Sequence, residues 1–204
     1  MARFRILTVC TGNVCRSPVA EQVLRARLDD ARGIIDLESA GFMALVGDGM
    51  PDQAANLSSS LGGNPSGHTA RQLTEQQILE ANLVLAMSRE HRREIVSLVP
   101  KASRYTVTIR EFARLSADLD SWDFLDITAL PQRPASARLD ALVALIASRR
   151  GQVEPAASPE DDDVADPYMQ SDERYALTGS QLAPAIEEVH RVIRLALAPR
   201  GEVA

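Results

Sequence analysis

Several features are scarce in this 204-residue sequence, and their scarcity narrows the class of protein. Two cysteines, Cys10 and Cys15, are far fewer than a disulfide-stabilised secreted domain carries, which favours a reducing, cytoplasmic location. The N-terminal apolar run covers only 6–10 and is interrupted at Thr8, so it is too short for a signal-peptide core or a membrane span. Acidic residues (28 Asp and Glu) outnumber basic ones (22 Lys and Arg), and the formal net charge of −6 argues against nucleic acid as a partner.

The order of the secondary-structure patterns predicts the fold class. The composition, 45% hydrophobic and 25% charged, is that of a globular chain able to bury a core. Helical patterns near Pro18, Asp52, Thr74 and Ser88 alternate with segments of strand character at 4–9, 34–38, 83–87 and 105–109. This alternation predicts an α/β fold with a four-stranded parallel sheet flanked by helices on both faces. A last helix is predicted to start or kink near 179–184.

Residues 116–163 interrupt this alternation. They contain a helical pattern at 135–149, proline-rich flanks and the acidic run 160–163. We expect a single domain over 1–204 in which 116–163 is an insertion outside the core. A passive surface insertion and a lid or docking element are equal alternatives for it, because loops tolerate added residues at low cost.

Residues 10–18, CTGNVCRSP, form the most informative motif. Five residues separate Cys10 from Arg16, between a predicted strand and a predicted helix. A loop that leads into a helix directs backbone N–H groups and the positive end of the helix dipole toward one point, which suits a phosphate dianion. The predicted phosphate-binding residues are Thr11, Gly12, Asn13, Val14, Cys15, Arg16 and Ser17.

Individual side chains of this loop have distinct predicted roles. Gly12 allows a backbone conformation that a Cβ would oppose. Arg16 offers a planar fork to two phosphoryl oxygens. Cys10 lies in the same positive field, which favours its nucleophilic thiolate, and Ser17 can donate a hydrogen bond to the sulfur. We therefore predict a cysteine-dependent phosphatase with Cys10 and Arg16 as catalytic residues.

Two other interpretations of the cysteines, a buried apolar residue and a zinc site, have less support than a catalytic role. An isolated Cys10 would most often be a small buried apolar residue, but Arg16 and a helix-opening Ser-Pro in the same motif favour chemistry. A zinc site needs four ligands, and the histidines (His68, His91 and His190) have no ligand spacing. We expect neither a metal nor a cofactor.

Hydrolysis of a phosphate monoester also needs a proton donor at the leaving oxygen. Asp166, followed by Pro167, is the best candidate, because proline biases the preceding backbone toward an extended turn that can present the carboxylate. Tyr168 could form an aromatic wall for the substrate. From the residues alone, other acids stay open as the donor: Asp161, Asp162, Asp163 and Asp172.

The sequence resembles the low-molecular-weight protein tyrosine phosphatases in segments 9–18, 39–41, 67–72, 83–87 and 166–168. The resemblance implies Cys10 as a nucleophile that forms a phosphocysteine, Arg16 as the phosphate clamp and Asp166 as the proton donor. It also implies that Asn13 and His68, with Ser17, support the loop.

Other proteins with this loop remain as alternatives. Thioredoxin-coupled arsenate reductases need further cysteines beyond Cys15, and this chain has none there. Reductases usually carry serine at the position of Val14 and phosphoarginine phosphatases carry threonine, whereas Val14 resembles the apolar residue of the tyrosine phosphatases. An arsenate reductase that uses a small-molecule thiol stays open, as does a phosphate-binding module without catalysis.

Segment 44–49 resembles the bacterial exopolysaccharide- and capsule-associated subgroup, in which Leu45 would contact the substrate. The resemblance implies phosphotyrosine protein substrates, including an autophosphorylated bacterial tyrosine kinase that controls exopolysaccharide export. The chain departs from the family at 116–163, where roughly forty extra residues precede Asp166. The spacing of Cys10 and Cys15 predicts a reversible disulfide that protects the nucleophile. The oligomeric state is not predicted.

Overall fold

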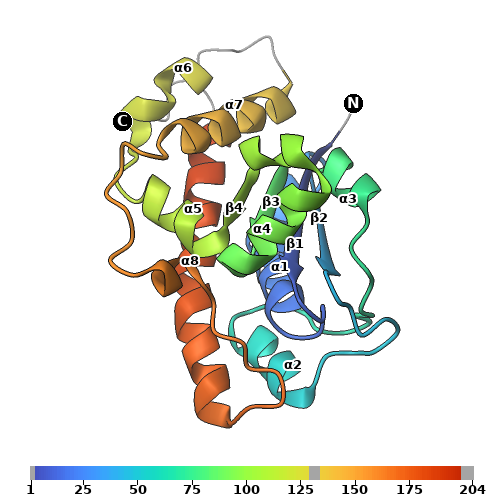
Figure 1. The fold of residues 1–204 in the computed structure, drawn as a ribbon. Coiled ribbons are helices and arrows are strands. Elements are labelled where there is room, and N and C mark those ends of the chain that lie inside the picture. Colours follow the sequence, from blue (N-terminus) through green and yellow to red (C-terminus); the bar gives the residue numbers. More distant parts are fainter. Residues whose placement is uncertain (1–2, 129–133, 199–204) are drawn as a thin grey trace.

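The computed structural model describes residues 3–128 and 134–198 (Figure 1). Its centre is a sheet of four parallel strands, which confirms the predicted fold class. The strands are β1 (Phe4–Cys10), β2 (Ile35–Gly41), β3 (Leu83–Ala86) and β4 (Thr106–Thr108). Their order in the sheet is β2-β1-β3-β4, so β1 lies between β2 and β3.

The helices fall largely where the sequence predicts them. Thr74 caps a helix by accepting a hydrogen bond from the Gln77 N–H (3.3 Å), and Ser88 caps the next by accepting from the His91 N–H (3.2 Å), as expected. The α-helices are α1 (Arg16–Arg27), α2 (Asp52–Ser60), α3 (Glu75–Glu80), α4 (Arg89–Leu98), α5 (Ile109–Ser116), α6 (Leu125–Thr128), α7 (Ala135–Ser148) and α8 (Asp172–Leu197). Short 3₁₀ helices are η1 (Asp29–Ala31), η2 (Pro100–Arg104), η3 (Ser121–Phe124) and η4 (Pro159–Asp162).

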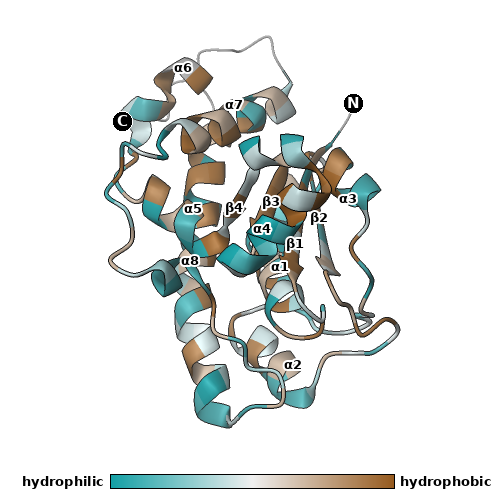
Figure 2. Cartoon of the chain, in the orientation of Figure 1, coloured by the Kyte–Doolittle hydropathy of each residue, from teal (hydrophilic) through white to brown (hydrophobic). Residues whose placement is uncertain are grey.

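Helices cover both faces of the sheet, as predicted. Phe4 and Ile6 of β1 point to one face and pack with α1, α5, α7 and α8. Leu7 and Val9 point to the other face and pack with α3 and α4. The alternation follows from the two-residue period of a strand. Figure 2 shows hydrophobic residues in the central strands and hydrophilic residues at the N-terminal end of α8.

Helix α7 belongs to the main core, so the expectation that 116–163 lies outside the core was wrong for this part. Leu139, Leu142, Val143 and Ile146 are buried in the same apolar cluster as Phe4. They recur at helical spacing, and each such residue contributes about 1.5–3 kcal/mol by leaving water. The prediction gave too much weight to the proline-rich flanks. Residues 129–133, within the predicted insertion, lie outside the described residues.

Helix α8 begins at Asp172 and continues through Pro184, so of the two predicted alternatives near 179–184 the start was wrong and the kink stays a prediction. Gly179 is a packing residue: a Cβ there would lie 2.7 Å from Cδ1 of Leu57 in α2. Pro184 donates no backbone hydrogen bond to Ser180, but Ala185 and Ile186 directly after it are buried. Tertiary packing therefore outweighs the local helix-breaking signals.

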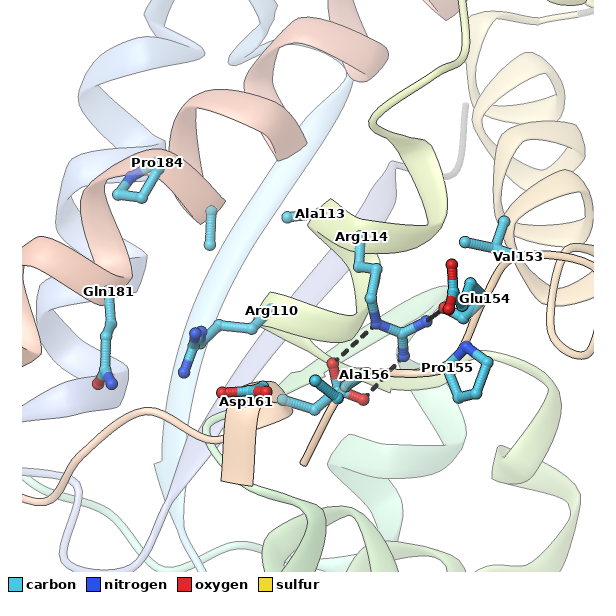
Figure 3. A pocket seen from close by; sticks show the side chains of 13 residues that line it. Arg110, Ala113, Arg114, Val153, Glu154, Pro155, Ala156, Asp161, Gln181 and Pro184 are labelled. Atoms are coloured by element: carbon cyan, nitrogen blue, oxygen red, sulfur yellow. Dashed lines mark hydrogen bonds and ion pairs between the residues drawn. The ribbon is translucent and has the colours of Figure 1, made fainter. Parts of the chain in front are cut away.

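Residues 153–164, here called the return segment, lead from α7 toward Asp166 and are fastened to α5. Arg114 donates two hydrogen bonds to the Asp162 carboxylate (2.8 and 3.2 Å) and one to the Glu154 carbonyl (2.9 Å). Figure 3 shows Arg114 beside Glu154. Thr108 donates to the Asp162 carbonyl (2.7 Å). A cavity of about 620 Å³ lies between α5, the return segment and α8.

Replacing Arg114 with methionine is expected to lower the free energy of unfolding by about 1–3 kcal/mol, because a partly buried carboxylate loses charge-assisted partners. Urea denaturation measures the change. Arg194→Met, which removes an exposed pair with Asp30, is the matched control and should cost under about 1 kcal/mol. Equal losses in the two variants would contradict a fastening role for Arg114.

Candidate active site

The site lies at the carboxyl ends of β1 and β3. Strands β2 and β3 flank β1 on opposite sides, so the chain connections diverge at this end and leave a crevice, the usual place for a ligand in an open α/β sheet. Residues 11–15 form a loop there, and α1 starts at Arg16. Val9 of β1 pairs with Ala86 of β3, which brings the segments after both strands together.

Asn13 is the central brace of this loop. Its backbone has a positive φ of 56°, which asparagine tolerates better than most residues. Its fully buried amide donates to the hydroxyls of Ser17 (3.0 Å) and Ser39 (2.9 Å) and accepts from the Arg71 N–H (2.9 Å). The loop is therefore held from three elements of the chain before any ligand binds.

Two further residues fix the loop backbone. His68 donates from Nε2 to the Asn13 carbonyl (2.7 Å), and because a carbonyl only accepts, this ring nitrogen carries the proton. Gly41, at the end of β2, allows a close approach: a Cβ there would lie 2.5 Å from the Thr11 carbonyl oxygen. The contacts of Asn13, Ser17 and His68 are those expected of supporting residues.

Cys10 is 2% exposed, and its sulfur is surrounded by donors. Sγ lies 3.0 Å from the Ser17 hydroxyl, and the Asn13 N–H donates to it (3.3 Å). The first turn of α1 adds the positive end of a helix dipole. The Cys10 sulfur is therefore contacted by a hydroxyl and by a backbone N–H of its own loop.

Arg16 is 5% exposed, and hydrogen bonds to the protein occupy both terminal nitrogens of its guanidinium. Nη1 donates to the Val164 carbonyl (3.2 Å), and Nη2 donates to the Thr11 hydroxyl (3.3 Å) and to the Asp166 carboxylate (2.6 Å). The Nε–H is buried and has no hydrogen-bond partner among the described residues. A buried donor without an acceptor is costly, and its position on the Nε–Nη2 edge suits an oxyanion.

Asp166 is the candidate acid that the structure brings to Arg16. Its side chain is 49% exposed, and its second oxygen accepts from the Tyr168 N–H (3.2 Å). The other candidates are engaged elsewhere or lie outside the site: Asp162 pairs with Arg114, Asp163 accepts from the Arg89 N–H (2.6 Å), Asp161 accepts from the Ser158 N–H (2.9 Å) and Asp172 starts α8. The alternatives left open by the sequence are therefore disfavoured by position.

The rim of the site is apolar on the side of segment 42–48. Leu45 donates its N–H to the Gly12 carbonyl (3.0 Å), and Leu45 and Val14 both lie beside Gly12. Tyr168 lies in segment 166–168, here called the acid loop, and is partly exposed. A cavity of about 430 Å³ extends from Arg16 and Asp166 along α4 and the return segment.

Cys15 lies beneath the loop and differs from Cys10 in its surroundings. The pKa of the Cys15 thiol is raised from 9.0 to about 11. Burial is the largest cause, and the nearby Cys10 and Asp166 contribute to the same rise. Its Sγ lies 3.7 Å from the Tyr175 hydroxyl, a hydrogen bond that partly lowers this pKa. Burial also raises the pKa of Tyr175 above its usual range. Cys15 is thus held as a neutral thiol.

Sequence reasoning missed Val164, whose carbonyl accepts from Arg16, and four further residues around the loop. Ser39 and Arg71 brace Asn13, and Ser88 and His91 reach Thr11 from the segment after β3. Only Ser39, Arg71 and the capping role of Ser88 had a sequence signal, through the motif resemblance and the helix cap. Within the described ranges, no cluster of His, Cys, Asp or Glu could hold a metal ion, and no helix is long and apolar enough to cross a membrane.

Comparison with known proteins identifies relatives of this loop and fold. The family model described as low molecular weight phosphotyrosine protein phosphatase matches residues 5–153. The phosphatase Etp of Escherichia coli K12 is 36% identical over 102 residues, which are 50% of this chain and 66% of Etp. The chain thus spans just under two thirds of that relative.

Two solved structures share the fold. The low molecular weight protein tyrosine phosphatase from T. tengcongensis superposes with a TM-score of 0.64 at 28% identity, covering 93% of this chain and 99% of that chain. The arginine phosphatase YwlE of Geobacillus stearothermophilus has a TM-score of 0.64 at 24% identity, covering 94% and 93%. Asp166 lies beyond the residues that the family model matches, so its place in the site rests on the contacts described above. With nearly three quarters of its length matched by the family model, the chain belongs to the low molecular weight phosphotyrosine protein phosphatase family.

Proposed function

We propose that this chain is a cysteine-dependent protein-tyrosine phosphatase that hydrolyses phosphotyrosine monoesters through a phosphocysteine. The observation that carries the proposal is the buried Nε–H of Arg16, which has no partner among the described residues, in the same loop as the Cys10 sulfur with its contacts to Ser17 and Asn13. The two groups provide an oxyanion-binding edge and a nucleophile within one loop.

In the first step, the Cys10 thiolate attacks phosphorus, the S–P bond forms and the bond from phosphorus to the tyrosine oxygen breaks. Arg16 and the loop N–H groups hold the equatorial oxygens, where negative charge is spread in the transition state. Asp166 gives its proton to the departing phenolic oxygen. Loss of this proton leaves Asp166 as a carboxylate.

In the second step, Asp166 takes a proton from water, whose oxygen attacks phosphorus while the S–P bond breaks. The hydrogen bond from Ser17 stabilises the sulfur as it leaves with its negative charge. The products are inorganic phosphate and the restored thiolate, so the residues return to their starting states.

Asp166 must change partner during this cycle. In the free protein it accepts a hydrogen bond from Nη2 of Arg16 (2.6 Å), while the Nε–H has no partner among the described residues. A phosphoryl dianion bound at the Nε–Nη2 edge competes for Nη2 and repels a carboxylate, so Asp166 turns toward the leaving oxygen. Its half-exposed position leaves room for this turn.

The apolar rim supports an aromatic substrate. Val14 is buried beside Leu45, and Tyr168 offers a ring from the acid loop, so a planar phenyl group would be lined by carbon on both sides. We propose Leu45 and Tyr168 as substrate contacts. Arginine phosphatases share the fold, and arsenate reduction with a small-molecule thiol is not favoured by the family match.

Hydrolysis rates on matched peptides bearing phosphotyrosine, phosphoserine or phosphoarginine test the substrate class. We expect phosphotyrosine to be preferred, and a preference for phosphoarginine would overturn the assignment. Reduction of arsenate in the presence of a thiol, without phosphatase activity, would overturn the reaction itself.

Segment 44–49 supports a finer proposal, a role on an autophosphorylated bacterial tyrosine kinase that controls exopolysaccharide export. A reducing, cytoplasmic location fits two buried free thiols, one of which serves as nucleophile. Dephosphorylation of such a kinase's tyrosine-rich tail, measured against a scrambled phosphopeptide, tests this partner.

We also propose that Cys10 and Cys15 form a reversible disulfide. Peroxide oxidises the Cys10 thiolate to a sulfenic acid, and the Cys15 thiolate then attacks that sulfur and displaces hydroxide. Because the pKa of Cys15 is raised to about 11, only a small fraction is thiolate at neutral pH, so the second step should accelerate about tenfold per pH unit between 7 and 9.

Loss of free thiols after one equivalent of peroxide, followed over time at each pH, measures this step. Cys15→Ser is the control: without the disulfide, excess peroxide carries the Cys10 sulfenic acid on to the sulfinic acid, so a reducing thiol should restore less activity than in the unchanged protein. A rate that does not change with pH would contradict Cys15 as the attacking thiol.

A further inference from the structure

A chain of hydrogen bonds links the segment after β3 to the phosphate loop. Ser88 Oγ lies 2.9 Å from Nδ1 of His91, and Nε2 of the same ring lies 2.9 Å from the Thr11 hydroxyl. Thr11 in turn accepts a hydrogen bond from Nη2 of Arg16 (3.3 Å). Histidine 91 is thus connected to the guanidinium through one hydroxyl, and it has no place in the mechanism above.

The His91 ring is built into the protein as a neutral group. It is 5% exposed, and burial, with a smaller contribution from the charge of Arg16, lowers its pKa from 6.5 to about 3. A neutral imidazole has one donor and one acceptor nitrogen, which matches the two hydroxyls of Ser88 and Thr11. The ring therefore fixes Thr11 without adding a second positive charge beside Arg16.

The Thr11 hydroxyl is one of the acceptors that hold the Arg16 guanidinium. The Nη2 group, which has two hydrogens, donates both to Asp166 and to the Thr11 hydroxyl. When a phosphoryl group takes the hydrogen now given to Asp166, the bonds to Thr11 and to the Val164 carbonyl remain. These two acceptors hold the guanidinium plane in place while its Nε–Nη2 edge binds the ligand.

We propose that His91 is a positioning residue for the phosphate clamp: it holds the Thr11 hydroxyl so that Arg16 presents its Nε–Nη2 edge to the phosphoryl group. The inference rests on the proposed function of the loop as a phosphate site. The topology explains the contact, because Thr11 follows β1 and Ser88 to His91 follow β3, and these strands are adjacent and parallel.

Binding of inorganic phosphate by calorimetry, together with kcat and KM for an aryl phosphate, tests the proposal. Thr11→Val and His91→Leu should each weaken phosphate binding by about tenfold or more, the effect expected for one hydrogen bond to a charged group. The double variant should be no weaker than the worse single variant, because both act through one hydroxyl. Thr11→Ser keeps the hydroxyl and should weaken phosphate binding less than Thr11→Val does.

Thr74→Ala is the control for a purely structural effect. It removes a helix cap in α3, away from the loop, and should lower stability while leaving phosphate binding unchanged. Additive losses in the double variant, or a His91→Leu protein that is less stable but binds phosphate normally, would overturn the proposal. If His91→Leu does not fold, the comparison of Thr11→Val with Thr11→Ser tests the proposal instead. Equal phosphate affinities of these two variants would overturn it.

The phosphate measurement separates this inference from the proposed function. An unchanged protein that binds phosphate but hydrolyses no phosphomonoester would refute the phosphatase assignment, while the effects of Thr11 and His91 on phosphate affinity would still be measured. An unchanged protein that does not bind phosphate would refute both.

Discussion

Cys10→Ser is expected to abolish hydrolysis of an aryl phosphate while the protein continues to bind inorganic phosphate. A serine hydroxyl is not ionised in this loop and is a far weaker nucleophile than a thiolate, so kcat should fall by about 10⁴-fold or more. The phosphate affinity should persist, because Arg16 and the loop N–H groups are unchanged and Asn13 still braces the loop. Steady-state kinetics and phosphate calorimetry on the same sample measure the two properties.

Cys15→Ser is the matched control for this substitution. It changes the other thiol of the loop, which lies beneath the site against Tyr175, and should retain activity within about tenfold. Residual turnover in Cys10→Ser above about one per cent would refute Cys10 as the nucleophile. Loss of phosphate binding along with activity would instead indicate that the substitution disturbs the loop.

Asp166→Asn is expected to slow hydrolysis in proportion to the basicity of the leaving group. General acid catalysis contributes about 10²–10⁴-fold, and the loss should be largest for phenyl phosphate and smallest for a nitrophenyl phosphate, whose oxygen leaves without a proton. Phosphate binding should become tighter, because the variant removes a negative charge that competes for Nη2 of Arg16. A series of aryl phosphates and one phosphate titration measure both effects.

The control for Asp166→Asn is Asp172→Asn, which neutralises an exposed carboxylate at the start of α8 and should leave rates and phosphate affinity unchanged. A loss in Asp166→Asn that is uniform across leaving groups would argue against proton donation. Unchanged phosphate affinity would argue that the ion pair with Arg16 does not compete with the ligand.

Local signals were sufficient for most of the elements. The apolar runs of β1 and β3 and the caps at Thr74 and Ser88 are properties of a few adjacent residues, and they were predicted correctly. The boundaries of β4 and α8 were less accurate: Tyr105 lies outside β4, and α8 passes through Pro184. These depend on packing against distant segments, which outweighs local preference.

The core position of α7 and the His91 contact have a different origin. The pattern of Leu139, Leu142 and Ile146 indicates an amphipathic helix but not which surface covers it, and the structure places it against the sheet and α8. Nothing near His91 in the sequence indicates Thr11, because the two are eighty residues apart and meet only through the pairing of β1 with β3.

The sequence by itself determined which residues come together in the candidate phosphate loop, because Cys10, Asn13, Arg16 and Ser17 lie within one turn-forming segment whose short spacing sets their geometry. Only the tertiary structure decided which carboxylate reaches Arg16 and which groups hold its guanidinium. Asp166, Val164 and Thr11 converge there because the return segment is fastened to α5 and runs beside the end of β3. Contacts between residues so far apart are set by packing of the whole chain, which no local pattern records.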